Sequence, residues 1–180
     1  TFGADSYAAT VAENSGRTHL FQVTASDDDL NENGTIIFSI VAGNILDAFE
    51  VNATTGDVYS KANAMNREIT GSYTIAITAS DSSSSPLQAT VNATIDVLDV
   101  NDNDPVLQSI ADESIFENAA PFMFERASCY DIDFEHNGTI GFTLVSTHDG
   151  RFAIDATSGM ISTGALLNRE LQDTWVIEVM

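Results

Sequence analysis

The sequence contains very little positive charge. Its 180 residues include six Lys and Arg side chains against 27 Asp and Glu, which gives a formal net charge of −21 at pH 7. Binding to nucleic-acid phosphates requires clustered Lys and Arg, so this composition excludes nucleic acid as a partner. An acidic excess by itself indicates only solubility through self-repulsion. A functional interpretation therefore depends on whether the acidic residues cluster.

Cysteine and long apolar runs are also scarce. Cys129 is the only cysteine, which excludes a disulfide framework. No stretch approaches the roughly 18 consecutive apolar residues of a membrane helix, so we expect any membrane anchor to lie outside this sequence. The histidines are widely spaced and form no zinc-binding pattern. Hydrophobic residues nevertheless make up 43% of the chain, which is enough to build a folded core.

The chain does contain an internal repeat, which is the first feature to establish in any sequence. Glu13-Asn14 recurs 104 residues later as Glu117-Asn118, and Asn66-Arg67-Glu68 recurs 102 residues later as Asn168-Arg169-Glu170. Further pairs at the same spacing are Asp27 with Asp131, Asp29 with Asp133, and residues 33–36 with 137–140. The small drift in spacing is what short loop deletions produce. We therefore expect two copies of one domain.

Within each copy, apolar residues alternate with polar ones over short segments that are separated by Gly, Asn, Asp and Ser. Residues 73–79 and 91–97 are clear examples. This period of two is typical of half-buried strands, and no window shows a helical stripe. About seven strands in each repeat predict an all-β fold of tandem antiparallel Greek-key β-sandwiches, immunoglobulin-like but without the disulfide. We expect the first repeat at 1–98, a linker at 99–105, and a second repeat at 106–180 that is truncated before its last strand.

The linker Asp99-Val100-Asn101-Asp102-Asn103-Asp104-Pro105 is strongly acidic. One interpretation is a polar connection in which Asn and Asp form turns and Pro105 ends the preceding strand. The other is that carboxylates from both repeats converge on it, and that a cation offsets their mutual repulsion. The six residues concerned are Glu13, Glu68, Asp99, Asp102, Asp131 and Asp133. Hard oxygen ligands from several segments favour Ca²⁺ over Mg²⁺, because Ca²⁺ tolerates irregular geometry.

Taken together, these motifs resemble the cadherin repeat over essentially the whole chain. DVNDNDP at 99–105 resembles the inter-repeat linker, and AEN and FEN resemble the N-terminal glutamate motif. DDD and DID resemble the aspartate-x-aspartate loop, NRE resembles the DRE motif, and ASD at 79–81 resembles the strand-end motif. Each motif is weak alone, but the set in this order and spacing is highly specific.

The resemblance implies up to three Ca²⁺ ions at the linker. The outer ion would take Glu13, Asn66, Glu68 and Asp102, and the middle ion Glu13, Glu68, Asp99, the Val100 carbonyl, Asp102 and Asp133. The third would take Asn101, the Asn103 carbonyl, Asp131, Asp133 and the Asn137 carbonyl. Asp27, Asp29 and Asp81 would form half of another site, facing a preceding repeat. Asn66 stands where the family usually has Asp, so the outer ion is expected to bind most weakly.

The resemblance also implies a function. We expect a piece of a calcium-dependent cell-adhesion ectodomain on the extracellular face of the plasma membrane, in which Ca²⁺ stiffens the linker. Its partner would be another cadherin ectodomain, either homophilic or heterophilic. The alternative is an extracellular spacer or a carbohydrate- or matrix-binding module. The absence of an N-terminal tryptophan favours a protocadherin-like or giant many-repeat relative over a junctional cadherin.

An enzyme is disfavoured, because the acidic residues lie in linker-facing loops and no catalytic His or nucleophile motif accompanies them. N-x-[ST] sequons at Asn33, Asn52, Asn92 and Asn137 are compatible with a secreted glycoprotein.

Overall fold

The computed structural model describes residues 1–27, 35–83 and 85–180. The chain divides into two compact units, Thr1–Val100 (unit 1) and Asn101–Met180 (unit 2), and their boundary falls inside the expected linker. Asp29 of the expected half-site and the sequon at Asn33 lie outside the described residues.

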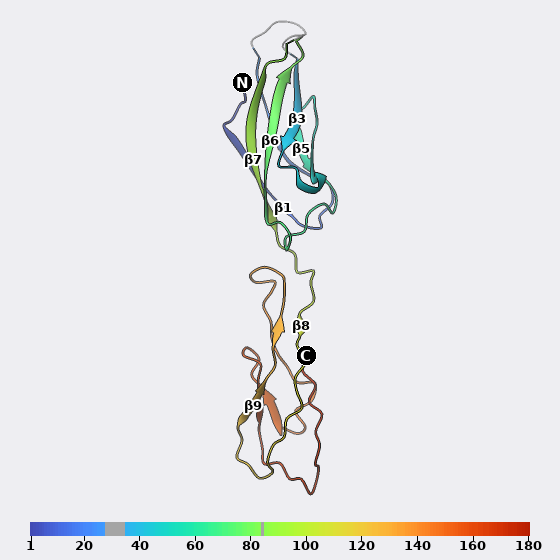
Figure 1. The fold of residues 1–180 in the computed structure, drawn as a ribbon, viewed down its shortest axis with the longest axis vertical. Coiled ribbons are helices and arrows are strands. Elements are labelled where there is room, and N and C mark those ends of the chain that lie inside the picture. Colours follow the sequence, from blue (N-terminus) through green and yellow to red (C-terminus); the bar gives the residue numbers. More distant parts are fainter. Residues whose placement is uncertain (28–34, 84) are drawn as a thin grey trace. The chain divides into compact units, whose positions relative to one another are not determined.

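The larger sheet of unit 1 contains four strands in the order β1-β7-β6-β3. Their bounds are β1 (Ser6–Ala12), β3 (Ile36–Ala42), β6 (Ser72–Asp81) and β7 (Gln88–Leu98). Figure 1 shows β7 between β1 and β6. The long alternating segments 73–79 and 91–97 thus form the two central strands, antiparallel to each other with Tyr73 opposite Ile95.

The smaller sheet has the order β2-β5-β4 and is antiparallel throughout. Its strands are β2 (Thr18–Gln22), β4 (Phe49–Val51) and β5 (Asp57–Ser60), and a short 3-10 turn, η2 (Ile45–Asp47), precedes β4. The chain crosses between the two sheets after β1, β2, β3 and β5, whereas β4 and β5, like β6 and β7, are neighbours within one sheet. With seven strands among the described residues, unit 1 has the β-sandwich architecture that the sequence predicts.

Alternation along the strands places the core of unit 1 between its two sheets. The inward positions of β7 from Val91 to Val97 are all buried, and they alternate with exposed polar residues as the two-residue period requires. From β6 and β4, Tyr73 and Phe49 meet edge to face with ring centroids 5.1 Å apart. Fully buried side chains such as Ile75, Ile77 and Ile95 fill the space around them. Each is worth roughly 1.5–3 kcal/mol of transfer free energy.

One pairing in unit 1 departs from the antiparallel prediction. β1 runs parallel to β7 over seven residue pairs, from Ser6 with Asn92 to Ala12 with Leu98. A two-residue period reveals that a segment is a strand with one buried face, but it does not reveal the direction of the neighbouring strand. The direction is therefore a result that only the structure supplies.

Unit 2 is also built of strands, but they are shorter. β8 (Val106–Leu107) pairs with β10 (Cys129–Tyr130), and β11 (Phe152–Ile154), β12 (Met160–Thr163) and β9 (Met123–Arg126) form a three-stranded sheet. The expectation of about seven strands is therefore not met here. The counterpart of β6, residues 174–180, contributes only an isolated bridge between Leu144 and Val179. The counterpart of β1, residues 110–116, pairs with no strand.

Candidate metal centre

Glu13 lies at the end of unit 1 from which the chain continues into residues 101–105. It follows directly after β1, and its N–H donates to the Leu98 carbonyl at 3.0 Å, extending the β1–β7 pairing. Its carboxylate is buried, with 1% of the residue exposed. Oε1 accepts the Val100 N–H at 2.9 Å and Oε2 accepts the Arg67 N–H at 2.6 Å. The carboxylate thus holds together the start of the linker and the loop before β6.

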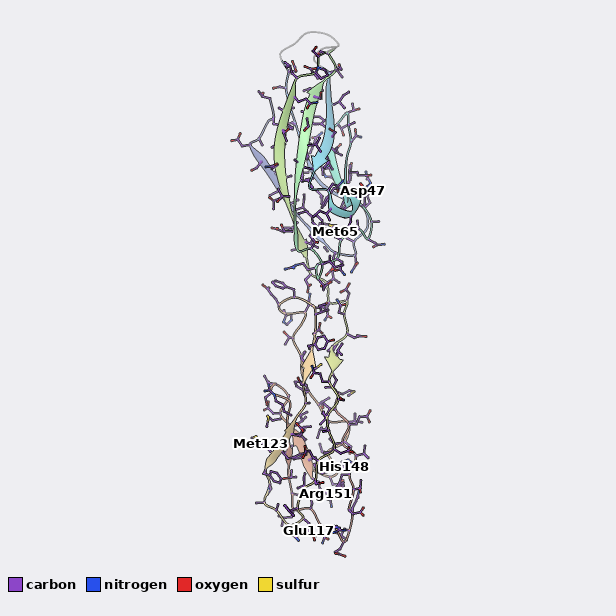
Figure 2. All side chains as sticks on the ribbon, in the orientation of Figure 1. Asp47, Met65, Glu117, Met123, His148 and Arg151 are labelled. Carbon is purple, nitrogen blue, oxygen red and sulfur yellow. The ribbon has the colours of Figure 1, made fainter. Side chains whose placement is uncertain are left out.

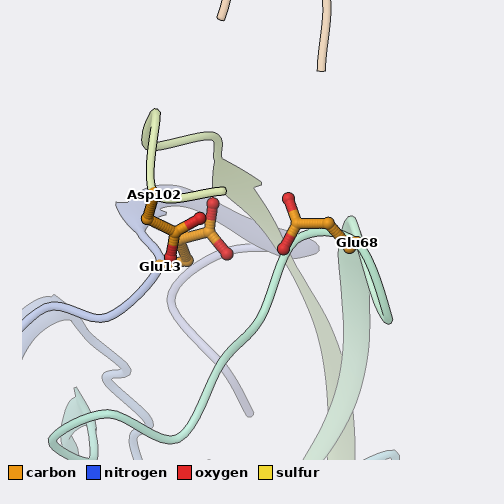
Figure 3. A group of neighbouring side chains, drawn as sticks. All are labelled: Glu13, Glu68 and Asp102. Carbon is orange, nitrogen blue, oxygen red and sulfur yellow. The ribbon is translucent and has the colours of Figure 1, made fainter. Parts of the chain in front are cut away.

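That loop presents Glu68 to the same end of the unit. The Asn66 side-chain oxygen accepts the Ile69 N–H at 2.9 Å, and the Asn66 carbonyl accepts the Thr70 N–H at 3.0 Å. These bonds close a single turn that carries Glu68. Figure 3 shows the Glu13 and Glu68 carboxylates turned toward one another, drawn with Asp102 from the chain beyond Val100.

The acidic side chains of unit 1 at this end are close enough to interact electrostatically. A carboxylate oxygen of Glu68 lies within 4.8 Å of a carboxylate oxygen of Glu13. A carboxylate oxygen of Glu68 also lies within 4.8 Å of a carboxylate oxygen of Asp99. Two negative charges at 4 Å repel by about 1 kcal/mol even in bulk water, and by more where they are partly desolvated. Oxygen atoms that approach from several segments are the ligand type that Ca²⁺ prefers.

Unit 2 gathers its own polar residues at the end where the chain enters it. Asp133 is buried, with 7% exposed, and its carboxylate accepts two bonds from Asn103: the side-chain amide at 2.6 Å and the backbone N–H at 3.3 Å. The same Asn103 amide donates to Asp102 Oδ1 at 2.7 Å, and Asp131 Oδ1 accepts the Asp133 N–H at 2.9 Å. Asn103 therefore joins the linker to the aspartate loop.

This role of the Asn103 side chain was not predicted from the sequence, which indicated only a contribution from the Asn103 carbonyl. The aspartate loop closes further on, where the Asn137 N–H donates to the Phe134 carbonyl at 3.2 Å. Gly138 lies so close to the Asp133 carbonyl that a side chain at that position would collide with it. Asn101 and Asp102 are exposed. The carbonyl roles expected for Val100, Asn103 and Asn137 stay predictions.

The expected half-site at the other end of unit 1 is only partly assembled. Asp81 is buried and accepts the Ser83 hydroxyl at 2.8 Å and the N–H groups of Ser83 and Leu87 at 3.1 and 3.2 Å. These hydrogen bonds, led by the Ser83 hydroxyl, hold the pKa of Asp81 below its ordinary value. Asp27 is exposed. Among the described residues, neither belongs to a group of three acidic side chains with ligand atoms within 4.8 Å.

Unit 2 repeats the local structure around Glu13 with the residues of its own motifs. Glu117 Oε2 accepts the Arg169 N–H at 3.0 Å, as Glu13 accepts that of Arg67. Asn168 Oδ1 caps its turn by accepting the Glu170 N–H at 2.8 Å. Glu117, labelled in Figure 2, is exposed, whereas Glu13 is buried. The repeated motifs therefore build a similar turn in both units, although the Asn side chain accepts from Ile69 in unit 1 and from Glu170 in unit 2.

The part of the chain that the structure describes contains no helix long and apolar enough to cross a membrane.

Comparison with known proteins gives consistent matches. A family model described as "Cadherin domain" matches residues 7–98. Protocadherin Fat 2 of Mus musculus is 34% identical over 182 residues, which cover 99% of this chain and 4% of that protein. Protein dachsous of Drosophila melanogaster is 33% identical over 177 residues, 97% of this chain and 5% of that protein. The chain thus spans only about a twentieth of these relatives.

Solved structures give the same result. Mouse cadherin-23 EC22-24 superimposes with a TM-score of 0.88 at 26% identity, covering 99% of this chain and 58% of that one. Extracellular cadherin domains 3-6 of protocadherin gamma B2 superimpose with a TM-score of 0.75 at 29% identity, covering 93% and 43%. Both similarities extend well beyond unit 1.

Proposed function

The chain belongs to the cadherin family, and from this premise we propose that it is part of an adhesion ectodomain in which Ca²⁺, bound around residues 99–105, stiffens the connection between two repeats. The relatives with which it aligns are of the protocadherin and Fat type, as expected from the sequence. Cadherin domains are adhesion modules rather than enzymes.

The clustering of Glu13, Glu68 and Asp99 at the exit of unit 1 is the observation that carries this proposal. Glu13 is almost fully buried and its two hydrogen bonds come from neutral backbone groups, so its negative charge calls for a cation nearby. In unit 2, Asp133 is also buried and is tied to Asn103. Because residues 101–103 directly follow Val100, both sets are available to ions bound along one short segment.

We assign the ligands as the sequence predicts. The outer ion takes Glu13, Asn66, Glu68 and Asp102, and the middle ion takes Glu13, Glu68, Asp99, the Val100 carbonyl, Asp102 and Asp133. The third ion takes Asn101, the Asn103 carbonyl, Asp131, Asp133 and the Asn137 carbonyl. The donors are all oxygens, which selects hard cations, and their irregular origin favours Ca²⁺ over Mg²⁺. Asp27, Asp29 and Asp81 would complete a comparable site with residues of a preceding repeat.

The mechanism is mechanical. Without Ca²⁺, repulsion among the carboxylates leaves the connection between the repeats free to bend, whereas bound ions tie each repeat to the linker. Extracellular modules bind Ca²⁺ with Kd values of about 0.1–1 mM, so these sites are largely filled outside a cell. The stiffened pair then presents a surface for another cadherin ectodomain, on the extracellular face of the plasma membrane.

Small-angle X-ray scattering tests this mechanism. We expect the maximum dimension of the chain to vary widely in chelator and to converge on one extended value in Ca²⁺, with Mg²⁺ at the same concentration having little effect. The matched control is Asp104→Asn, which removes one linker charge outside the proposed ligand set and leaves the response to Ca²⁺ intact. Scattering that is identical with and without Ca²⁺ would rule out stiffening.

Bead aggregation tests the adhesive role separately. Beads coated with the protein are expected to aggregate in Ca²⁺ when the opposing beads carry a cadherin ectodomain. Retention on immobilised glycans or matrix proteins, with no aggregation, would instead assign the chain to a spacer or a carbohydrate-binding module.

A further inference from the structure

The tetrapeptide Val-Asn-Ala-Thr occurs twice in unit 1, at 51–54 and at 91–94. Each copy contains an N-x-[ST] sequon, which is the acceptor signal for N-linked glycosylation. The local sequence therefore does not distinguish Asn52 from Asn92. Their surroundings in the fold do, because one lies in a turn and the other lies in the middle of a strand.

The presence of an asparagine at position 52 is explained by the turn that it closes. The Asn52 side-chain oxygen accepts the N–H groups of Thr54 and Thr55 at 2.9 and 3.1 Å. Asp155, its counterpart in unit 2, accepts two N–H groups in the same way, at 3.2 and 2.7 Å. The turn thus requires only an acceptor oxygen, which Asp supplies as well as Asn. The sequon at Asn52 follows from turn chemistry.

Asn92 has no such role. It is the only asparagine within the strands of the described residues, and it lies in the middle of β7, a central strand of the larger sheet. Asn is disfavoured in strands, because its side chain competes with the backbone for hydrogen bonds. Asn92 is exposed, and no hydrogen bond among the described residues involves its side-chain amide. The fold therefore does not account for an asparagine at this position.

The Asn92 side chain points away from the core. Val91 and Ala93 on either side of it are buried, so the two-residue period directs Asn92 to the outer face of the sheet. Thr94, which completes the sequon, is directed to the same face and is also exposed. A substituent on the amide nitrogen of Asn92 would therefore leave the core of unit 1 unchanged.

The residues around Asn92 leave room for a bulky substituent. Ser6 of β1 and Ala76 of β6 lie opposite it on the two neighbouring strands. Opposite residues of an antiparallel pair have Cβ atoms only about 4.5–5.5 Å apart, so a long side chain at position 76 would crowd a sugar on Asn92. The next residues on this face are short as well: Ala8, Thr74, Thr78, Thr90 and Thr94.

The outer face of the larger sheet is also nearly free of charge. Among β1, β3, β6 and β7 the only charged residues are Asp81 and Asp96. Asp81 is buried, so Asp96 is the one charged side chain on the outer face, and it accepts the Ser72 hydroxyl at 2.7 Å. A neutral face of this kind in a chain with a net charge of −21 is compatible with an uncharged, hydrophilic cover.

The other two sequons lack this setting. Asn137 is half-buried in the aspartate loop of unit 2, beside the proposed Ca²⁺ ligands. Asn33 lies outside the described residues.

We propose that Asn92 carries an N-linked glycan, which covers the outer face of the larger sheet. In the transfer, Nδ2 of Asn92 forms a bond to the anomeric carbon of the first sugar, and the bond from that carbon to the phosphate oxygen of a lipid-pyrophosphate oligosaccharide donor breaks. The lipid pyrophosphate leaves with the electron pair of the broken bond, and the amide loses one proton. The proposal rests on the proposed function in one respect, the passage of the chain through the secretory pathway.

Site-resolved mass spectrometry tests the proposal. The full chain is secreted from a mammalian cell line behind a cleavable leader. Its glycans are then removed with peptide N-glycosidase in heavy-oxygen water, which converts each glycosylated Asn to labelled Asp. We expect the label at Asn92 in most molecules. The matched control is Asn52→Asp, which keeps its turn as Asp155 does and should leave the label at Asn92 intact.

Two substitutions of Thr94 separate the sequon from the strand. Thr94→Val keeps the β-branched shape but removes the hydroxyl, so it should lose the glycan at Asn92 and migrate as a smaller species in electrophoresis. Thr94→Ser keeps the hydroxyl and should retain the glycan. Asn92→Gln should behave like Thr94→Val. After enzymatic removal of the glycans, all three variants should unfold like the wild type, because both positions are exposed.

Nuclear Overhauser effects test whether the glycan covers the face. The measurement uses the Asn52→Asp variant with isotope-labelled alanine methyl groups. We expect contacts between the acetyl methyl group of the first sugar and the methyl groups of Ala8 and Ala76. Ala62, which is exposed in a loop away from this sheet, should show none.

Two outcomes would overturn the proposal. The first is an unlabelled Asn92 in the secreted protein. If Asn52 is labelled in that protein while Asn92 is not, the chain has passed through the secretory pathway, so this proposal fails without affecting the proposed function. The second is a glycan at Asn92 that makes no contact with Ala8 or Ala76, which would refute the covering of the face.

Discussion

Replacing Glu13 with Gln separates the hydrogen-bonding role of this side chain from its charge. Glu13 is 1% exposed and accepts two backbone N–H groups, from Arg67 and Val100. Gln retains one acceptor oxygen but turns an amide NH₂ toward the second donor, so one buried donor loses its acceptor. That costs about 1–3 kcal/mol in the free energy of unfolding, whether or not Ca²⁺ is present.

Removing the charge of Glu13 causes a second loss of stability, which appears only when Ca²⁺ is present. At a concentration tenfold above Kd, each site stabilises the folded state by about 1.4 kcal/mol, and a tenfold weaker site contributes about 0.4 kcal/mol. Because Glu13 is assigned to two ions, the calcium-dependent stabilisation should fall by about 2 kcal/mol. Hydrogen exchange measured by mass spectrometry at β6 and β7, with chelator and with Ca²⁺, reports the free energy of unfolding of unit 1 specifically.

Glu117→Gln is the matched control. Glu117 has the equivalent bond to Arg169 but is exposed and is not among the proposed ligands. Its substitution should lower the free energy of unfolding by at most about 1 kcal/mol. The stabilisation of unit 1 by Ca²⁺ should stay unchanged. If Glu13→Gln lowers the stability of unit 1 equally in chelator and in Ca²⁺, Glu13 is not a ligand and the reasoning fails.

Three further predictions concern single positions. Asn66→Asp should tighten the weakest Ca²⁺ site by adding a charge, whereas Asn168→Asp should not, and calorimetric titration showing no gain for Asn66→Asp would remove it from the ligand set. The Ser158 N–H and hydroxyl donate hydrogen bonds to Asp155 and keep its pKa low. The contribution of these bonds to the stability of the folded state is therefore complete above the pKa of a free aspartate, about 3.9. It disappears as pH falls through the lowered pKa of Asp155. The variant Asp155→Asn has the residue type of Asn52, its counterpart in unit 1, and should keep the turn. Its free energy of unfolding, measured with denaturant, should no longer fall in acid in this way. A pH profile of that free energy identical to the wild type would contradict the prediction. Gly56 has φ +74° and faces the Val23 carbonyl. The change Gly56→Ala should therefore lower the free energy of unfolding by more than about 1 kcal/mol. Thermal unfolding of this variant like that of the wild type would contradict the prediction.

The sequence predicts the strands of unit 1 well because their apolar residues alternate over long stretches. The apolar residues of these stretches, such as Ile75, Ile77 and Ile95, lie on the inward faces of β6 and β7 as the pattern indicates. The pattern carries no information about strand direction, so the parallel pairing of β1 with β7 could not be foreseen. In unit 2 the same alternation at 175–179 forms only an isolated bridge, between Val179 and Leu144, so an alternating pattern does not by itself ensure a paired strand.

The acidic positions could be found from the repeat, but their contacts could not. Glu13 is recognisable because its motif recurs as Glu117, yet the two differ sharply in burial. Residue spacing does not predict that Asn103 bonds both Asp102 and Asp133, because this depends on where the loop of unit 2 approaches the linker. Burial and side-chain amide contacts are properties of packing rather than of local sequence.

The parallel pairing of β1 with β7 determines how unit 1 withstands tension. The chain enters through β1 at Ser6 and leaves through β7 at Leu98, so a pull on the two ends drags neighbouring strands past each other in opposite directions. The interstrand bonds are then loaded in shear, all together, rather than broken one at a time from an end. Forced unfolding depends on the height of the unfolding barrier. Tension applied along the chain therefore meets unit 1 in the direction in which its β1–β7 pairing resists separation most.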